Sequence, residues 1–122
     1  MIDLEKTFLN RNFEPDEGKV TARIKCPADF AAFDGHFPGQ PVLPAVIQLA
    51  AVRILASSAA GIELEPVATE KLKFSAMVLP EEEINISLVM KKIDACWEVR
   101  FRLSREGGKV SAGTILYREG GN

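Results

Sequence analysis

The chain has 122 residues, of which 47% are apolar and 26% are charged. Those values predict one globular domain over residues 1–122, with a core of modest size, and give no reason to expect a second domain. A net charge of −2 gives no general reason to expect a nucleic-acid partner.

The cysteine content and the N-terminal sequence predict a cytoplasmic protein. Cys26 and Cys96 are too few for a disulfide framework and lack metal-ligand spacing, so we expect a reducing compartment and two core residues. The first residues carry charges where a signal peptide needs an apolar stretch, and no apolar run reaches the roughly 18 residues of a membrane span. We therefore expect no membrane span. The short acidic run at 81–83 is interpreted as a solvated turn.

Two elements are predicted in the first half of the chain. Residues 19–27 alternate apolar and polar side chains, which is the period of a half-buried strand. Residues 44–60 form an almost continuously apolar segment that Gly61 is well placed to end as a helix. Pro44 suits the first helical turn, where its missing N–H costs nothing. A helix that is apolar on nearly every side belongs in an interior.

The second half of the chain reads as four strands joined by short turns. The predicted strands cover residues 66–80, 83–92, 96–104 and 109–118, and several of them alternate with period two. Asp94-Ala95 and Gly107-Gly108 are the predicted two-residue hairpin loops, the second because glycine accepts positive φ angles. One strand before the helix and about four after it predict an α+β hot-dog fold, a curved antiparallel sheet wrapped around one long helix.

The stretch GHFPGQPVLPAVIQLA, residues 35–50, carries the single histidine of the chain. It resembles the motif of the β-hydroxyacyl-(acyl carrier protein) dehydratases of the FabA/FabZ type, G-H-F-P-G-x-P followed by two apolar residues and P-G-V. The similarity continues through residues 71–92, and the segment 27–46 looks closest to the small branch found in aryl-polyene and related lipid pathways.

The resemblance implies a 3-hydroxyacyl-thioester dehydratase without a cofactor or a metal. His36 would be the general base, because an imidazole exchanges protons near neutral pH. The start of the helix would polarise the thioester carbonyl through unpaired backbone N–H groups. The implied substrate-binding residues are Phe37, Gly39, Pro44, Ala45, Val46, Gln48 and Ala50. Such sites lie between two subunits, so the resemblance also implies a homodimer or a higher oligomer of dimers, with an acyl carrier protein or acyl thioester as partner.

The sequence departs from the family pattern at two positions. The family's acidic residue, fourteen positions after the histidine, is replaced by Ala50, and the glycine after the third proline is replaced by Ala45. A positioned acid contributes roughly 10²–10⁴-fold to a rate. Asp34 and Glu70 are the candidate replacement acids. The favoured interpretation, however, is that Asp34 is a turn residue and Glu70 a surface residue. Gln48 cannot deliver a proton at neutral pH and would at most orient water or substrate.

Other charged residues leave further alternatives open. Arg53 is interpreted as structural, its charged end reaching solvent. Lys71 with Lys73, and Arg100 with Arg102, could form a docking patch for an acidic carrier protein, or simply the charged face of a solvated strand.

Because Ala50 removes the acid, the sequence also allows a second class of function: a non-catalytic acyl-binding or heteromer-forming hot-dog subunit. Thioester hydrolysis ranks last.

Overall fold

The computed structural model describes residues 4–30 and 42–120. In chain order the elements are η1 (Leu4–Thr7), β1 (Phe8–Glu14), η2 (Pro15–Glu17), β2 (Lys19–Lys25), α1 (Ala45–Ala60), β3 (Leu64–Phe74), β4 (Glu83–Ile93), β5 (Cys96–Arg105) and β6 (Gly108–Glu119). None of the helices in these ranges combines the length and the apolarity that a membrane crossing requires.

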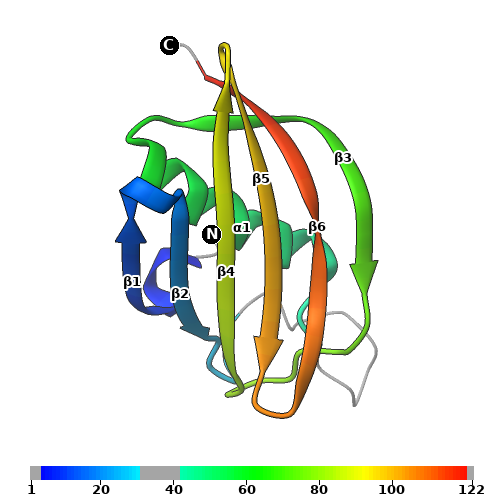
Figure 1. The fold of residues 1–122 in the computed structure, drawn as a ribbon. Coiled ribbons are helices and arrows are strands. Elements are labelled where there is room, and N and C mark those ends of the chain that lie inside the picture. Colours follow the sequence, from blue (N-terminus) through cyan, green and yellow to red (C-terminus); the bar gives the residue numbers. More distant parts are fainter. Residues whose placement is uncertain (1–3, 31–41, 121–122) are drawn as a thin grey trace.

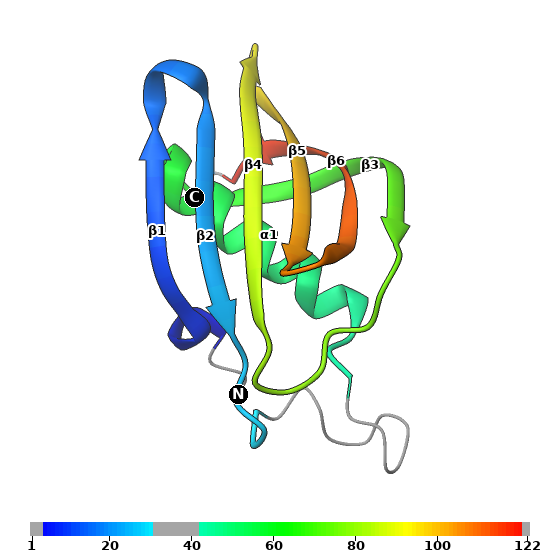
Figure 2. The ribbon, with the colours of Figure 1, turned by 60° about the horizontal axis from the view of Figure 1, so that its bottom comes forward.

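The six strands form one antiparallel sheet in the order β1-β2-β4-β5-β6-β3. Figure 1 shows this sheet in front of α1, with β1 and β3 at its two edges. Figure 2 shows the strands curving around the helix. This is the hot-dog fold that the sequence predicts.

The alternation of side chains explains which face of the sheet covers the helix. Ile84, Ile86, Leu88 and Met90 of β4 are buried, as are Val99, Phe101 and Leu103 of β5, while the residues between them are exposed or half-buried. From the helix, Ala51, Val52, Leu55 and Ala56 are fully buried against this face. Because α1 is apolar on most sides, it lies in the concavity of the sheet rather than on its solvent face.

Both ends of α1 follow from local backbone chemistry. Pro44 is the N-cap residue, with φ −61° and ψ 150°, so it immediately precedes the helix instead of forming its first turn as predicted. Gly61 ends the helix at φ 74°, and its N–H donates to the Ser57 carbonyl at 2.9 Å. A left-handed glycine at this position satisfies carbonyls that the helix leaves unpaired.

The hairpin loops confirm one sequence prediction and correct another. Asp94-Ala95 connects β4 to β5 as predicted, with Asp94 at φ 56°. The loop between β5 and β6 is Glu106-Gly107, one residue earlier than predicted, because Gly108 already pairs with Arg105 in the ladder. Gly107, at φ +88°, is the glycine that takes the left-handed conformation.

The strand predictions missed one strand and extended another too far. β1, at residues Phe8–Glu14, was not predicted, because it is an edge strand with no buried residue and therefore no clear alternation. β3 ends at Phe74 instead of continuing to Pro80. Beyond Phe74 the N–H groups of Ser75 and Ala76 both donate to the Val110 carbonyl, at 2.8 and 3.3 Å, and the chain leaves the ladder.

In the acidic run 81–83, Glu81 lies in a turn and Glu83 already begins β4, and the carboxylates are not merely solvated. Glu81 accepts a hydrogen bond from the Ala28 N–H at 3.0 Å, and Glu83 pairs with Arg23 at 3.1 Å. Glu82 pairs with Arg105 at 2.9 Å. These contacts tie the start of β4 to distant parts of the chain.

Candidate active site at the start of α1

Three of the predicted site residues lie outside the described residues. His36, Phe37 and Gly39 belong to the segment 31–41, as does Asp34. The described chain resumes at Val42, two residues before the N-cap of α1. The remaining predicted residues, Pro44, Ala45, Val46, Gln48 and Ala50, are all described.

The start of α1 is an open helix terminus. Ala45 and Val46 are both exposed, Val46 with 68% of its surface accessible. Their N–H groups lie in the first turn, where a helix offers no internal acceptor. Within residues 4–30 and 42–120 no side chain caps this end, and the first turn contains no acidic residue. The positive end of the helix dipole is therefore available to an external oxygen.

A hollow of about 320 Å³ opens beside this terminus. It is lined by Val42, Leu43, Ala45, Gln48 and the segment Phe74 to Met77. Two of the predicted substrate-binding residues, Ala45 and Gln48, therefore line one hollow, whereas Pro44, Val46 and Ala50 do not. We call it the α1 hollow.

Gln48 is buried, and its carboxamide is engaged within the chain. Its Nε2 donates to the Leu43 carbonyl at 3.5 Å, and its Oε1 accepts from the Ser111 hydroxyl at 2.9 Å. Only 3% of Gln48 and 2% of Ser111 are exposed. Sequence reasoning gave Gln48 a substrate-facing role and did not identify Ser111, which lies 63 positions away in sequence.

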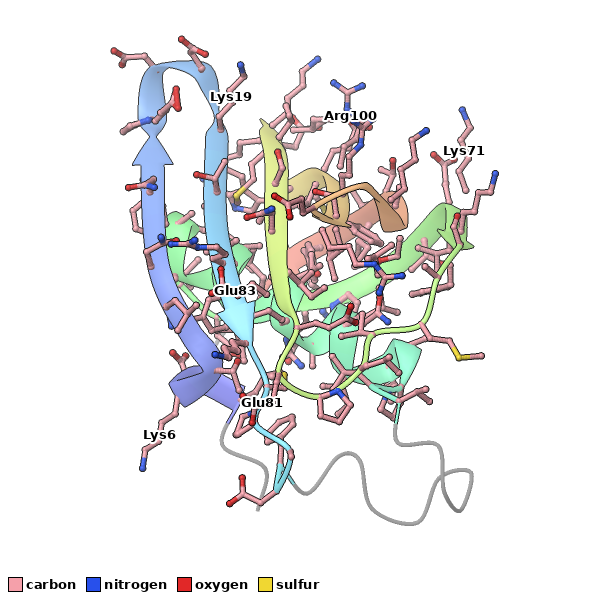
Figure 3. All side chains as sticks on the ribbon, turned by 90° about the horizontal axis from the view of Figure 1, so that it is seen from below. Lys6, Lys19, Lys71, Glu81, Glu83 and Arg100 are labelled. Atoms are coloured by element: carbon pink, nitrogen blue, oxygen red, sulfur yellow. The ribbon has the colours of Figure 1, made fainter. Side chains whose placement is uncertain are left out.

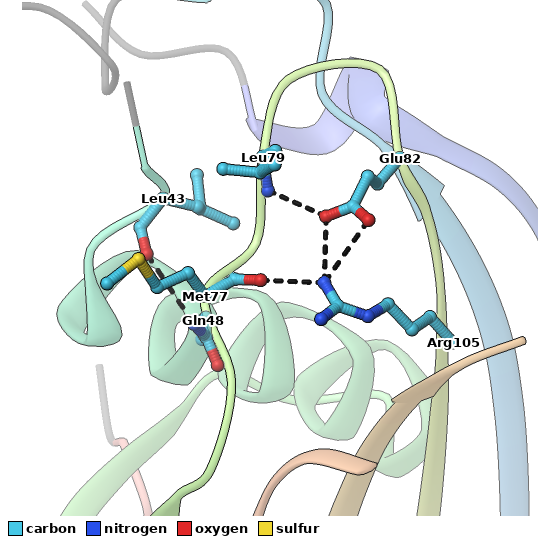
Figure 4. A network of polar contacts seen from close by, with 6 residues as sticks. All are labelled: Leu43, Gln48, Met77, Leu79, Glu82 and Arg105. Carbon is cyan, nitrogen blue, oxygen red and sulfur yellow. Dashed lines mark hydrogen bonds and ion pairs between the residues drawn. The ribbon is translucent and has the colours of Figure 1, made fainter. Parts of the chain in front are cut away.

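A second set of polar contacts supports the same wall of the hollow. Residues 75–79, here called the strap, connect β3 to the turn before β4, and the Val78 carbonyl of the strap accepts from the Leu43 N–H at 2.8 Å. Figure 4 shows the side chains that hold the strap: Arg105 donates to the Met77 carbonyl at 2.7 Å, and Glu82 accepts from the Leu79 N–H at 2.8 Å. No sequence motif pointed to Arg105 or Glu82.

Ala50 is half-buried on the face of α1 that also carries Val46 and Arg53, four residues before it and three after. The Nε of Arg53 donates to the Leu64 carbonyl at 2.6 Å, and its Nη2 lies 3.5 Å from Glu63. Arg53 is therefore structural as interpreted, but its charged end binds within the chain and does not simply extend into solvent. Glu70 is exposed on β3, as expected for a surface residue.

Burial raises the pKa of two further groups in the core. The pKa of the Cys26 thiol is raised to about 11 by desolvation, although a hydrogen bond with Thr7 opposes the shift. Desolvation also raises the pKa of Tyr117, with Arg53 opposing. Neither group lines the α1 hollow. Cys96, expected in the core, is only half-buried, and both thiols are free.

Three of the four basic residues singled out in the sequence meet on the outer face of the sheet. Lys71, Arg100 and Arg102 line a shallow hollow with Ser87, Val89 and Thr114, whereas Lys73 is not among its lining residues. Figure 3 shows Lys71 and Arg100 pointing away from α1. Among the described side chains, no ion pair includes any of these three.

A larger hollow, of about 500 Å³, lies at the other end of α1, and its lining includes Ala59, Phe13, Gly18 and Trp97. None of the described motif residues, 42–50, lines it. Within residues 4–30 and 42–120, no three His, Cys, Asp or Glu side chains gather as metal ligands would.

Comparison with known proteins identifies the family. The model of the ApeI-like family, described as ApeI dehydratase, matches residues 12–114. The chain belongs to this dehydratase family. It is 31% identical to an uncharacterised thioester dehydrase of Halalkalibacterium halodurans, over 90% of this chain and 78% of that protein.

Two further relatives extend this picture of the ApeI-like family. The 3-hydroxyacyl-[acyl-carrier-protein] dehydratase FabZ of Clostridium botulinum is 32% identical, over 86% of this chain and 78% of that protein. Among solved structures, the dehydratase heterocomplex ApeI:P from Xenorhabdus doucetiae superposes with a TM-score of 0.76 at 21% identity, covering 92% of this chain and 96% of that one. The FabZ-type resemblance and the hot-dog fold are thus both confirmed.

Proposed function

We propose that the chain is a 3-hydroxyacyl-thioester dehydratase-like protein that works on an acyl chain carried by an acyl carrier protein, with His36 as the general base. The observation that carries the proposal is the open start of α1, which borders the α1 hollow and follows the histidine motif directly. Membership of the ApeI-like family and the FabZ relatives support the same reaction class.

The proposed reaction removes one water from the acyl chain. His36 takes the α-proton, the electrons of that C–H bond form the α,β double bond, and the β-hydroxyl leaves as water with a proton from an acid. The N–H groups of Ala45 and Val46 stabilise the charge that develops on the thioester oxygen. The role of Phe37, Gly39 and Pro44 in this scheme is to hold the loop and the substrate.

The acid for the departing hydroxyl is the missing part of this site. Ala50 has no ionisable group, and in a homodimer both copies of the site have the same alanine. Asp34 and Glu70 remain candidate acids. Of these, Glu70 is exposed on β3 and is not among the described residues that line the α1 hollow.

A second candidate function follows from the same alanine. In a heteromer, a homologue with a carboxylate at this helix position would complete the site, and this chain would hold the acyl group or support its partner. One of its structural neighbours is itself a dehydratase heterocomplex, which favours this alternative.

In either case we propose that the chain works as a dimer. Exposed apolar side chains gather at the start of α1, along the edge strand β3 and on the strap: Val46, Val67, Leu72, Phe74, Met77 and Leu79. Of these, Phe74 and Met77 line the α1 hollow, and exposed apolar side chains beside a hollow and on an unpaired edge strand favour an interaction site.

The basic hollow formed by Lys71, Arg100 and Arg102 is the proposed docking surface for the acidic carrier protein. Its cations have no acidic partner among the described side chains, so an external carboxylate or phosphate would meet little competition. If this is the docking surface, the double substitution Arg100→Glu and Arg102→Glu lowers affinity for the carrier protein at low salt, where charge attraction is least screened. Unchanged affinity would remove this surface from consideration.

The proposed reaction is tested by mass spectrometry of a 3-hydroxyacyl carrier protein incubated with the purified chain, following the loss of one water. Turnover that disappears in His36→Ala identifies a dehydratase that obtains its acid from a residue other than Ala50. The matched pair Ala50→Glu and Ala50→Gln separates proton delivery from side-chain size, because only glutamate can act as the acid.

Activity that appears in Ala50→Glu and not in Ala50→Gln means that the pocket is competent and lacks its acid, which favours the heteromer. Absence of turnover in all of these variants, together with no binding of the acyl carrier protein, contradicts both functions.

A further inference from the structure

We propose that Ser111 and the Glu82–Arg105 ion pair are positioning residues that clamp Leu43 and thereby fix the start of α1. Leu43 directly precedes the N-cap, so its place in space determines where the N–H groups of Ala45 and Val46 point. The use of this clamp in catalysis rests on the proposed function, whereas the clamp itself does not.

The first arm of the clamp holds the carbonyl of Leu43. Gln48 donates to this carbonyl from one turn further along the helix, and the Ser111 hydroxyl fixes the other end of the Gln48 carboxamide. Both side chains are buried, so water cannot replace the missing partner if either is removed. The Ser111 hydroxyl therefore determines how the Gln48 side chain is oriented.

The second arm holds the N–H of Leu43 through the strap. Val78 accepts this N–H through its carbonyl, and its own side chain is buried, with 1% exposed. Its neighbours Met77 and Leu79 are 64% and 46% exposed, so apolar burial contributes little at those positions. Something other than apolar packing must hold the strap there.

The ion pair supplies that support. Arg105 Nη1 donates to the Met77 carbonyl, and Glu82 accepts the Leu79 N–H, so each partner binds the strap backbone on one side of Val78. The two side chains also join each other, at 2.9 and 3.2 Å. Each side chain is only 30% exposed, so solvent screens this ion pair less than it would screen a fully exposed pair.

Both arms of the clamp are attached to neighbouring residues of β6. Ser111 begins the first arm, and the carbonyl of the preceding residue, Val110, accepts the N–H groups of Ser75 and Ala76 at the beginning of the strap. A movement of Leu43 relative to β6 therefore stretches contacts in both arms. Ser111 and Arg105 do not line the α1 hollow, which makes them positioning residues and not catalytic ones.

Amide hydrogen exchange of the full chain tests the clamp without any assumption about the reaction. In Ser111→Ala and in Arg105→Met we expect the Leu43 N–H to exchange at least about tenfold faster than in the wild type, because its local opening becomes easier. Thr7→Val is the matched control: it also removes a buried hydroxyl, one that donates to the Leu4 carbonyl at 2.6 Å in η1. The Val99 N–H in the centre of the sheet reports whether the whole fold has loosened.

Leu43 exchange within twofold of wild type in both variants, or an equal rise in Thr7→Val, overturns the clamp. If Ser111→Ala does not fold, Ser111→Cys keeps the side-chain volume and replaces the hydroxyl by a weak donor. In Ser111→Cys we also expect the Leu43 N–H to exchange at least about tenfold faster than in the wild type.

Turnover of the 3-hydroxyacyl carrier protein tests the link to catalysis. We expect kcat to fall about tenfold in Ser111→Ala with KM within about threefold, since misplacement at a reacting centre is costly, and Ser111→Thr to restore part of the loss by returning the hydroxyl. Faster Leu43 exchange with unchanged kcat overturns the positioning role. If the wild type has no turnover, the chain is not a dehydratase on its own, and hydrogen exchange alone decides the clamp.

Discussion

Cys26 lies just after β2 in an environment that disfavours its thiolate. The residue is 2% exposed, and desolvation raises the pKa of its thiol to about 11. The unfolded chain binds fewer protons than the folded chain once the pH exceeds the ordinary thiol pKa of about 9. The neutral thiol thus contributes stability that is complete below pH 9 and is lost as the pH rises toward 11.

We therefore predict that the difference in unfolding free energy between the wild type and Cys26→Ala is about 1.5 kcal/mol smaller at pH 10 than at pH 7. Urea denaturation at the two pH values measures it. Titration of other groups affects both proteins alike and cancels in the comparison. A difference that stays constant with pH would mean that the thiol is not desolvated in the folded chain.

At the scale of elements, the β1–β2 connection shows how a single glycine sets two strands in place. Gly18 has φ +65°, and its carbonyl accepts the Met90 N–H at 2.8 Å. A Cβ at this position would lie 2.4 Å from the Met90 carbonyl oxygen. Because that oxygen belongs to the backbone of β4, the strand itself would have to move. The turn therefore needs glycine both for its conformation and for its size.

Comparison with Gly107 separates the cost of the left-handed conformation from the cost of the added Cβ. Gly107 has φ +88° but nothing within 4 Å of an added Cβ, so Gly107→Ala costs only the left-handed conformation, about 1 kcal/mol. Gly18→Ala adds a steric clash, and we predict a loss of about 3 kcal/mol in the free energy of unfolding. Equal losses in urea titrations of the two variants would show that the β1–β2 turn relaxes freely.

The elements that the sequence predicts correctly are those whose signals are local. α1 is marked by its apolar length and by Pro44 and Gly61, and the strands β2, β4 and β5 by regular alternation. β1 has no such signal, because an edge strand without a buried residue does not need alternating side chains. The register of the β5–β6 turn was missed by one residue, because two adjacent glycines satisfy the same rule and only the ladder pairing distinguishes them.

The residues of the candidate site also divide into those that local sequence predicts and those that depend on distant contacts. The motif and the helix start are contiguous in sequence, so Ala45 and Gln48 could be placed near a substrate from the pattern alone. Ser111, Glu82 and Arg105 could not, because their importance comes from contacts across 63 and 23 residues of chain. A buried serine in a strand has no distinguishing pattern until its partner is known.

At the scale of the whole molecule, the two edges of the sheet differ in character. β3 carries Val67 and Phe74 with 55% and 40% of their surfaces exposed, and Phe74 lines the α1 hollow together with the exposed Met77. β1, at the opposite edge, also exposes two apolar side chains, Leu9 at 50% and Phe13 at 45%, but the exposed residues between them include Asn10 and Asn12. An unpaired edge with apolar side chains favours association with another chain. The proposed dimer should therefore form through β3.

A β3 interface predicts different outcomes for three chemically similar substitutions at the two edges of the sheet. In a twofold dimer each substitution occurs twice, and burying one Phe or Val is worth about 1.5–3 kcal/mol. Phe74→Glu and Val67→Glu should each raise the dimer dissociation constant by at least about 100-fold, because they replace that gain with a buried charge. Phe13→Glu should leave it unchanged. Sedimentation velocity over a concentration series measures all three.

If Phe13→Glu dissociates the protein as readily as Phe74→Glu does, the interface is not at β3. A wild-type chain that remains monomeric alone but forms a complex with a homologue carrying the helix carboxylate would have a different meaning. It would show that the apolar edge at β3 is an interaction surface and that its natural partner is a different chain. That outcome would also account for Ala50, since only one subunit of such a pair needs to supply the acid.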